Sequence, residues 1–94
     1  MSQVTVRIPT PLRRFTGGAA EVTVEGDDVG EVLQALVARH DGLRASLFDG
    51  EGGLRSFINV YLDDQNIRSL ERLATPVNGA TVVHIVPAVA GGRP

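Results

Sequence analysis

The sequence predicts one α+β domain in which a single main helix crosses one face of a mixed sheet of four to five strands. The chain has 94 residues, the usual size of one compact domain. Its 43% hydrophobic and 21% charged residues are typical of a globular protein. The order of its periodic segments is two strands, a helix, a strand, a short strand and a last strand. An antiparallel hairpin followed by a helix and further strands favours a sheet with its helix on one face.

The first two strands form a predicted hairpin. Residues 4–9 alternate apolar and polar side chains with the two-residue period of a strand and stop at a Pro-Thr-Pro cluster. Residues 21–25 alternate again and end at Gly26. We expect a long, irregular connection between these strands, with a turn at Gly17 and Gly18.

The main helix is predicted directly after the hairpin. Asp28 is a suitable N-cap, and Glu31 follows it at the spacing of a capping box. Gly42 marks the end, which leaves a helix of about 12 residues. A short helical turn is also expected between Leu43 and Phe48. The apolar side chains of the main helix recur along one face, at Val29, Val32, Leu33, Leu36 and Val37.

The remaining strands follow a flexible loop over residues 49–56. Residues 57–62 are the predicted third strand, and 63–66 are a turn. Residues 67–68 are a very short predicted fourth strand. Residues 81–86 are apolar enough to be a central strand. This order is that of the ubiquitin-like β-grasp fold, in which the first and last strands pair in parallel at the middle of the sheet, joined by a long crossover.

Strand alternation divides the side chains between the two faces of this sheet. The face opposite the helix is expected to expose a cluster that includes aromatic and aliphatic side chains, Arg7, Phe57, Tyr61, His84 and Val86. The helix side is expected to hold the core, Val4, Val6, Ile8, Val22, Val24, Val32, Leu33, Leu36, Ile58, Val60, Leu62, Val83 and Ile85. The domain should occupy residues 1–86, and residues 87–94 should be a flexible tail.

Composition excludes several classes of function. The net charge is −2 and all nine basic residues are arginine, so no basic surface for nucleic acid or an anionic membrane is expected. The chain has no cysteine, which excludes a thiolate nucleophile or a thiolate metal site. Its two histidines are expected to be surface or packing residues. With no apolar run of about 18 residues and no signal-peptide pattern, a cytoplasmic protein is expected.

The C-terminal arm has the features of a segment that is delivered to another protein. Residues 87–92 can extend over about 20 Å. Gly91 and Gly92 have no Cβ atoms, so the backbone can pass through a narrow channel. A frayed terminus remains the alternative, because tails are often rich in glycine.

With this arm, the span from Val4 to Gly92 resembles the MoaD/ThiS family of ubiquitin-like sulfur carriers. Within that family the chain looks most like the CysO branch. The segments that support this are Arg7-Ile8-Pro9-Thr10, Phe15-Thr16-Gly17-Gly18, Ser56-Phe57-Ile58-Asn59-Val60-Tyr61 and Val86-Pro87-Ala88-Val89-Ala90-Gly91-Gly92.

The resemblance implies a carrier that is a substrate of partner enzymes and has no catalytic residues or bound cofactor of its own. An E1-like enzyme of the MoeB/ThiF type would use Mg-ATP to adenylate the Gly92 carboxylate, and sulfur would then replace AMP to give a thiocarboxylate. Members of the CysO branch deliver this sulfur to a cysteine synthase that uses pyridoxal phosphate (PLP). The expected docking residues for the partners are Arg7, Phe57, Tyr61, His84, Val86 and Val89.

One departure from the family pattern is that Arg93 and Pro94 follow the second glycine. Gly92 therefore has no free carboxylate in this chain. We expect a protease, by family analogy a JAMM-type zinc metallopeptidase, to cut between Gly92 and Arg93; the alternative is that the two residues are not native. Sulfur delivery to molybdopterin, thiamin or natural products such as thiosugars remains open, as does a protein modifier joined through Gly92 to lysines of its targets.

Overall fold

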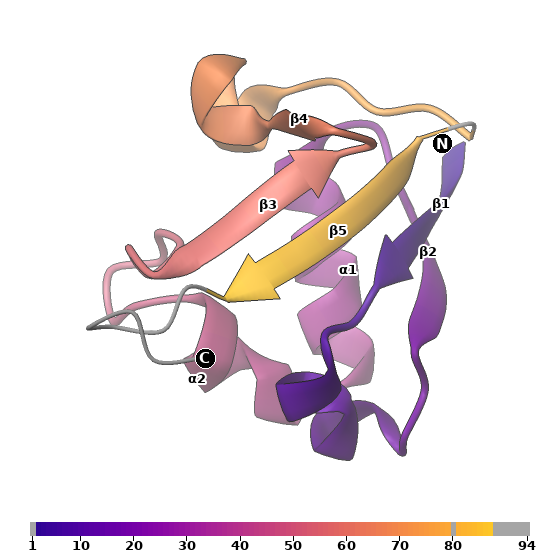
Figure 1. Ribbon diagram of the computed structural model, residues 1–94, viewed down its shortest axis with the longest axis vertical. Coiled ribbons are helices and arrows are strands. Elements are labelled where there is room, and N and C mark those ends of the chain that lie inside the picture. The colour runs from indigo at the N-terminus through magenta and orange to yellow at the C-terminus, as the bar shows by residue number, and fades with distance from the viewer. Residues whose placement is uncertain (1, 80, 88–94) are drawn as a thin grey trace.

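The computed structural model describes residues 2–79 and 81–87. A five-stranded sheet of order β2-β1-β5-β3-β4 packs against α1 (Val29–Arg39), and Figure 1 shows α1 lying across one face of it. The mixed sheet and its covering helix are as predicted. The strands are β1 (Ser2–Arg7), β2 (Glu21–Gly26), β3 (Ile58–Leu62), β4 (Gln65–Asn66) and β5 (Val82–Pro87), and the short helices are η1 (Thr10–Thr16), η2 (Asp41–Leu43), α2 (Arg44–Leu47), η3 (Ile67–Ser69) and η4 (Arg72–Ala74).

The first and last strands pair in parallel at the middle of the sheet, which confirms the predicted topology. Thr5 is in register with Val82, and Arg7 is in register with His84. The other three pairs, β1 with β2, β3 with β5 and β3 with β4, are antiparallel. The last strand, β5, is therefore hydrogen-bonded along both of its edges.

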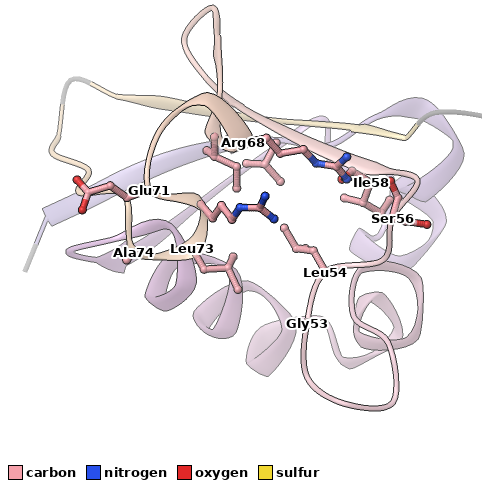
Figure 2. A pocket seen from close by; sticks show the side chains of 11 residues that line it. Gly53, Leu54, Ser56, Ile58, Arg68, Glu71, Leu73 and Ala74 are labelled. Atoms are coloured by element: carbon pink, nitrogen blue, oxygen red, sulfur yellow. Dashed lines mark hydrogen bonds between the residues drawn. The ribbon is translucent and has the colours of Figure 1, made fainter.

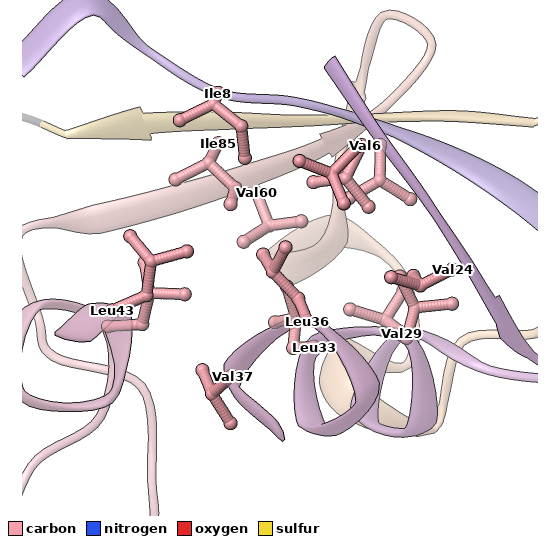
Figure 3. Packing of buried hydrophobic residues seen from close by; sticks show 14 of the residues in the cluster. Val6, Ile8, Val24, Val29, Leu33, Leu36, Val37, Leu43, Val60 and Ile85 are labelled. Atoms are coloured by element: carbon pink, nitrogen blue, oxygen red, sulfur yellow. The ribbon is translucent and has the colours of Figure 1, made fainter. Parts of the chain in front are cut away.

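The core lies between the sheet and α1, and every predicted core residue is buried. Figure 3 shows Ile8, which directly follows β1, and Val60 of β3 facing Leu33 and Leu36 of the helix. Further apolar residues extend this core beyond the prediction, Leu12, Val29, Val37, Leu43, Leu47, Phe48, Ile67 and Val77. Four of these come from short helices, η1, η2, α2 and η3, where the chain has no clear periodicity.

The main helix begins as the sequence predicts. The Asp28 carboxylate accepts a hydrogen bond of 2.8 Å from the Glu31 backbone N–H. The Glu31 carboxylate reaches back to the backbone N–H of Asp27, also at 2.8 Å, one residue earlier than the usual capping box places it. Together the two carboxylates satisfy backbone donors that the first turn leaves without helical partners.

Two predicted segments differ in the structure. The connection after β1 is not irregular throughout, because Thr10–Thr16 forms the 3-10 helix η1; a proline in the first helical positions is compatible with a helix start. The predicted fourth strand at 67–68 is wrong, since β4 is Gln65–Asn66 and Ile67 begins η3. The reason is local: the Asn66 side chain accepts from the Arg68 backbone N–H at 2.9 Å and caps this helix.

The strand ends also shift by one or two residues, as is usual. β1 starts at Ser2 and ends at Arg7, and β5 ends at Pro87, one residue after the predicted strand end. The predicted tail beyond Pro87 lies outside the described residues. Within residues 2–79 and 81–87, no helix has the length and apolar character needed to cross a membrane.

Candidate functional site

The exposed face of the sheet brings three predicted docking residues into one row. Arg7 of β1 is in register with His84 of β5, which is in register with Tyr61 of β3. The row continues to Glu21 of β2 at one end and Asn66 of β4 at the other. Positions far apart in the sequence thus form a line across all five strands on the face away from α1.

The apolar part of this face lies toward the end of β5. Val86 follows His84 by two residues and shares its face, and 43% of the Val86 residue surface is exposed. Its register partner is Asn59 of β3, whose side-chain oxygen accepts a hydrogen bond of 3.4 Å from the Asn66 amide. Tyr61 and His84 are half-buried, so together with Val86 they present a mixed apolar and polar surface. We call Arg7, Tyr61, His84 and Val86 the docking face.

Phe57 is equally exposed, at 43%, but it does not lie within a strand. It stands in the turn before β3, where the Ile58 backbone N–H donates to the carbonyl of Arg55 at 3.0 Å. Strand alternation therefore does not fix the direction of the Phe57 side chain. The predicted exposure of this ring is confirmed, and its membership of the docking face stays a prediction.

The charged side chains at this face are held only by an exposed ion pair. The Arg7 guanidinium lies 3.5 Å from the Glu21 carboxylate, and both side chains are about half exposed, at 50% and 54%. Exposed pairs of this kind contribute little to stability. Arg7 can therefore leave Glu21 and pair with an acidic group of a partner at small cost.

The C-terminal arm starts beside the docking face. The last described residue, Pro87, is in register with Ile58 at the end of the sheet and immediately follows Val86. The predicted adenylation and processing residues Gly91, Gly92 and Arg93, and the predicted docking residue Val89, lie outside the described residues. The structure thus places the root of the arm beside the exposed face.

The two polar loops that flank β3 do not have the geometry of ligand sites. Asp63 takes a left-handed conformation, with φ of 56°, in the two-residue turn between β3 and β4, and its carboxylate accepts from the Val82 backbone N–H at 3.3 Å. In the loop before β3, the Asp49 carboxylate accepts from the N–H groups of Glu51 and Gly53. The Asp63 carboxylate therefore ties its turn to the start of β5, and the Asp49 carboxylate holds its own loop together. No cluster of three or more His, Cys, Asp or Glu side chains suited to a metal ion occurs among residues 2–79 and 81–87.

Comparison with known proteins identifies the family. The model of the ThiS family matches residues 6–92, nearly the whole chain. The chain belongs to the ThiS family. This ThiS-family chain is 43% identical over 91 residues to the protein named sulfur carrier protein CysO of Mycobacterium tuberculosis, with 95% of this chain and 98% of the relative covered.

Two solved structures agree with this assignment. In the Amycolatopsis orientalis BexX/CysO complex, a chain 43% identical to this ThiS-family chain superposes with a TM-score of 0.86, covering 95% of this chain and 99% of the other. Small archaeal modifier protein 1 of Methanosarcina acetivorans is 31% identical and has a TM-score of 0.86, with 98% of both chains covered. The likeness to the CysO branch and the ubiquitin-like β-grasp fold are thereby confirmed.

Proposed function

We propose that this chain is a sulfur carrier whose working group is the backbone carboxylate of Gly92. The observation that supports this most is the extent of the family match, which ends at Gly92 and leaves out Arg93 and Pro94. The high identity to proteins named as sulfur carriers supports the same assignment. The chain would be a substrate of its partner enzymes and would bind no cofactor itself.

The carrier cycle needs a chemical activation that the folded domain does not supply. A carboxylate is a poor acyl donor, because an oxide is a bad leaving group. An E1-like enzyme of the MoeB/ThiF type joins the Gly92 carboxylate to the α-phosphate of Mg-ATP and releases pyrophosphate. A sulfide equivalent then attacks the Gly92 carbonyl carbon, the bond to AMP breaks, and the thiocarboxylate remains. As an anionic sulfur nucleophile it reacts at neutral pH, by the same logic that makes a thiolate reactive.

In this scheme the docking face positions the arm for activation. The face is built on strands that the core holds rigidly, and it ends at Pro87, where the arm begins. An enzyme that covers Val86 and Tyr61 is therefore next to the root of the arm. From there the roughly 20 Å reach of residues 87–92 suffices to place Gly92 in a catalytic pocket. The A. orientalis relative, which is solved in complex with BexX, supports the general idea that such carriers dock on partner proteins.

The first step must be removal of Arg93 and Pro94, because an amide at Gly92 cannot be adenylated. A JAMM-type zinc metallopeptidase is the proposed protease. The proposed acceptor of the sulfur is a PLP-dependent cysteine synthase, with molybdopterin, thiamin or thiosugar synthesis as alternative destinations.

A second function, protein modification, is favoured by the relatives named small archaeal modifier proteins. The same activated Gly92 would then form an isopeptide bond with a lysine of a target. This chain contains no lysine, so it cannot serve as such a target through a side-chain amine, and no chains of copies linked through lysine can form. It would act only as the donor.

Intact-mass spectrometry tests these proposals. The full-length chain and a form ending at Gly92 are each incubated with the activating enzyme of the same organism, Mg-ATP and a sulfur donor. We expect the Gly92-ended form alone to gain the mass of sulfur in place of oxygen. A diglycine remnant on lysines of other proteins would instead indicate conjugation. A full-length chain that acquires sulfur while retaining Arg93 and Pro94 would contradict the processing step.

A further inference from the structure

A groove that the proposed carrier function does not use lies on the helix side of β3, away from the docking face. It has a volume of about 640 Å³, within the range of about 300 to 1,000 Å³ that ligand-binding clefts usually have. Its walls are the loop before β3 on one side and η3 and η4 on the other. Figure 2 shows Leu54 and Leu73 on these opposite walls. The apolar lining consists of Leu54, Ile58, Val60, Ile67, Leu73 and Ala74.

The groove runs beside the edge of β3 that faces β4, over the part that β4 does not reach. β4 pairs only with Tyr61 and Leu62. At the start of β3 and just before it, the Arg68 guanidinium donates to the carbonyl of Ile58 at 3.4 Å and to that of Ser56 at 2.8 Å. Figure 2 shows the Arg68 side chain directed toward Ser56 and Ile58. A side chain thus satisfies carbonyl groups at a position where a longer β4 would supply backbone donors.

The groove is lined by positively charged side chains, although the chain as a whole has a net charge of −2. Arg68 and Arg72 both line it. Within the described residues, the Arg72 side chain makes no hydrogen bond or ion pair. Glu71 is the acidic residue among the lining residues, and Figure 2 shows its carboxylate directed away from the groove. An anionic group that enters the groove therefore meets two guanidinium groups and no opposing carboxylate.

The backbone at Arg72 is strained. Its φ is 56°, in the left-handed region where a residue with a Cβ atom is disfavoured by roughly 1 to 2 kcal/mol. Such conformations persist where the surroundings enforce them, and they gather at binding sites. Here the strained residue is the lining residue whose guanidinium group has no partner among residues 2–79 and 81–87.

We propose that this groove binds an extended, acidic segment of a partner protein. Aliphatic side chains of that segment lie against Leu54, Leu73 and Ala74, the part of the apolar lining that is not buried, and a carboxylate pairs with Arg72. A backbone N–H of the segment replaces Arg68 as the donor to the Ile58 carbonyl, which frees Arg68 for a second acidic group. Adding a strand to an exposed edge is a common mode of peptide recognition. The site is independent of Gly92 and of the docking face, because the groove lining and the docking face use opposite sides of β3.

The test is an NMR titration of the ¹⁵N-labelled full chain with the peptide acetyl-Ala-Leu-Asp-Leu-Ala-amide. We expect shifts of the backbone amides of Leu54, Ile67 and Leu73, and none at Arg7 or His84. The peptide with asparagine in place of aspartate is expected to bind about tenfold more weakly, since a hydrogen bond to a charged group is lost. Equal binding of the two peptides, shifts confined to the docking face, or no shifts at the groove would each overturn the proposal.

Two arginine variants test whether the peptide binds at Arg72. Arg72→Gln should weaken binding of the aspartate peptide about tenfold, and its folding is read from the same amide spectrum. Arg44→Gln removes an equal charge at an exposed position whose ion pair is with Asp41 at 3.5 Å, and it should leave binding unchanged. If the two variants weaken binding to the same extent, the effect is one of net charge and the proposed site is wrong.

Discussion

The docking face can be tested by placing a carboxylate at Val86. In the free chain 43% of this residue is exposed. If a partner covers that fraction, the apolar area lost in Val86→Asp is worth about 1 kcal/mol, because full burial of such a side chain contributes roughly 1.5 to 3 kcal/mol. A carboxylate left without a hydrogen-bond partner in the interface costs about a further 2 kcal/mol. The sum of about 3 kcal/mol corresponds to roughly a hundredfold weaker interaction.

The assay is the rate of pyrophosphate release by the activating enzyme, measured against the concentration of the Gly92-ended chain. We expect KM to rise about a hundredfold. Thermal unfolding separates this effect from instability, since the loss of strand propensity at Val86 is limited to about 1 kcal/mol. Leu70→Asp is the matched control, because Leu70 is also an exposed aliphatic residue, at 37%, but it follows η3 and lies outside the sheet. If the Val86 and Leu70 variants have the same KM, the docking face takes no part in activation.

Two further predictions concern stability. Gly26→Ala should lower the free energy of unfolding by about 2 kcal/mol, and Tm by roughly 8 to 16 °C, because the new Cβ atom would lie 2.8 Å from the backbone nitrogen of Val32. Gly50→Ala is its control, since a Cβ atom there meets nothing within 4 Å; equal Tm values for the two variants would contradict the steric argument. Asp28→Ala should cost about 1 kcal/mol through loss of the helix cap, whereas Asp28→Asn should retain most of that stability. Both are measured by thermal unfolding, and an Asn variant as unstable as the Ala variant would show that the cap is not the cause.

The sequence predicted the parts of the fold that depend on regular periodicity. The alternation in β1, the apolar run of β5 and the spacing of apolar residues in α1 were sufficient to place the core and the parallel central pair. The sequence did not correctly predict the boundaries of elements, or the short elements, that depend on a single local contact. At Ile67, a buried apolar residue suggested a strand, but the cap from Asn66 starts a 3-10 helix there. At η1, prolines that suggested a break stand at the start of a short helix.

The residues of the candidate sites could be predicted where they belong to regular strands and could not be predicted where they belong to turns or loops. Arg7, Tyr61 and His84 could be assigned to one exposed face because each belongs to a strand with clear alternation. The direction of Phe57 could not be assigned, since it lies in a turn. The groove at Arg68 and Arg72 has no signature in the sequence, because its walls come from separate loops and short helices that meet only in the folded chain. The left-handed backbone conformation of Arg72 could not be predicted from the sequence either, because an arginine gives no indication of that conformation.

The position of β5 has a mechanical consequence. Any partner that draws the C-terminal residues into its own pocket applies tension to Pro87, and through it to a strand that is bonded on one side to β1 and on the other to β3. The load meets first the ladder with β3, which reaches Pro87, and then also the ladder with β1, which ends at His84. To leave the sheet, β5 must therefore break its bonds to two neighbours, whereas an edge strand would break its bonds to one.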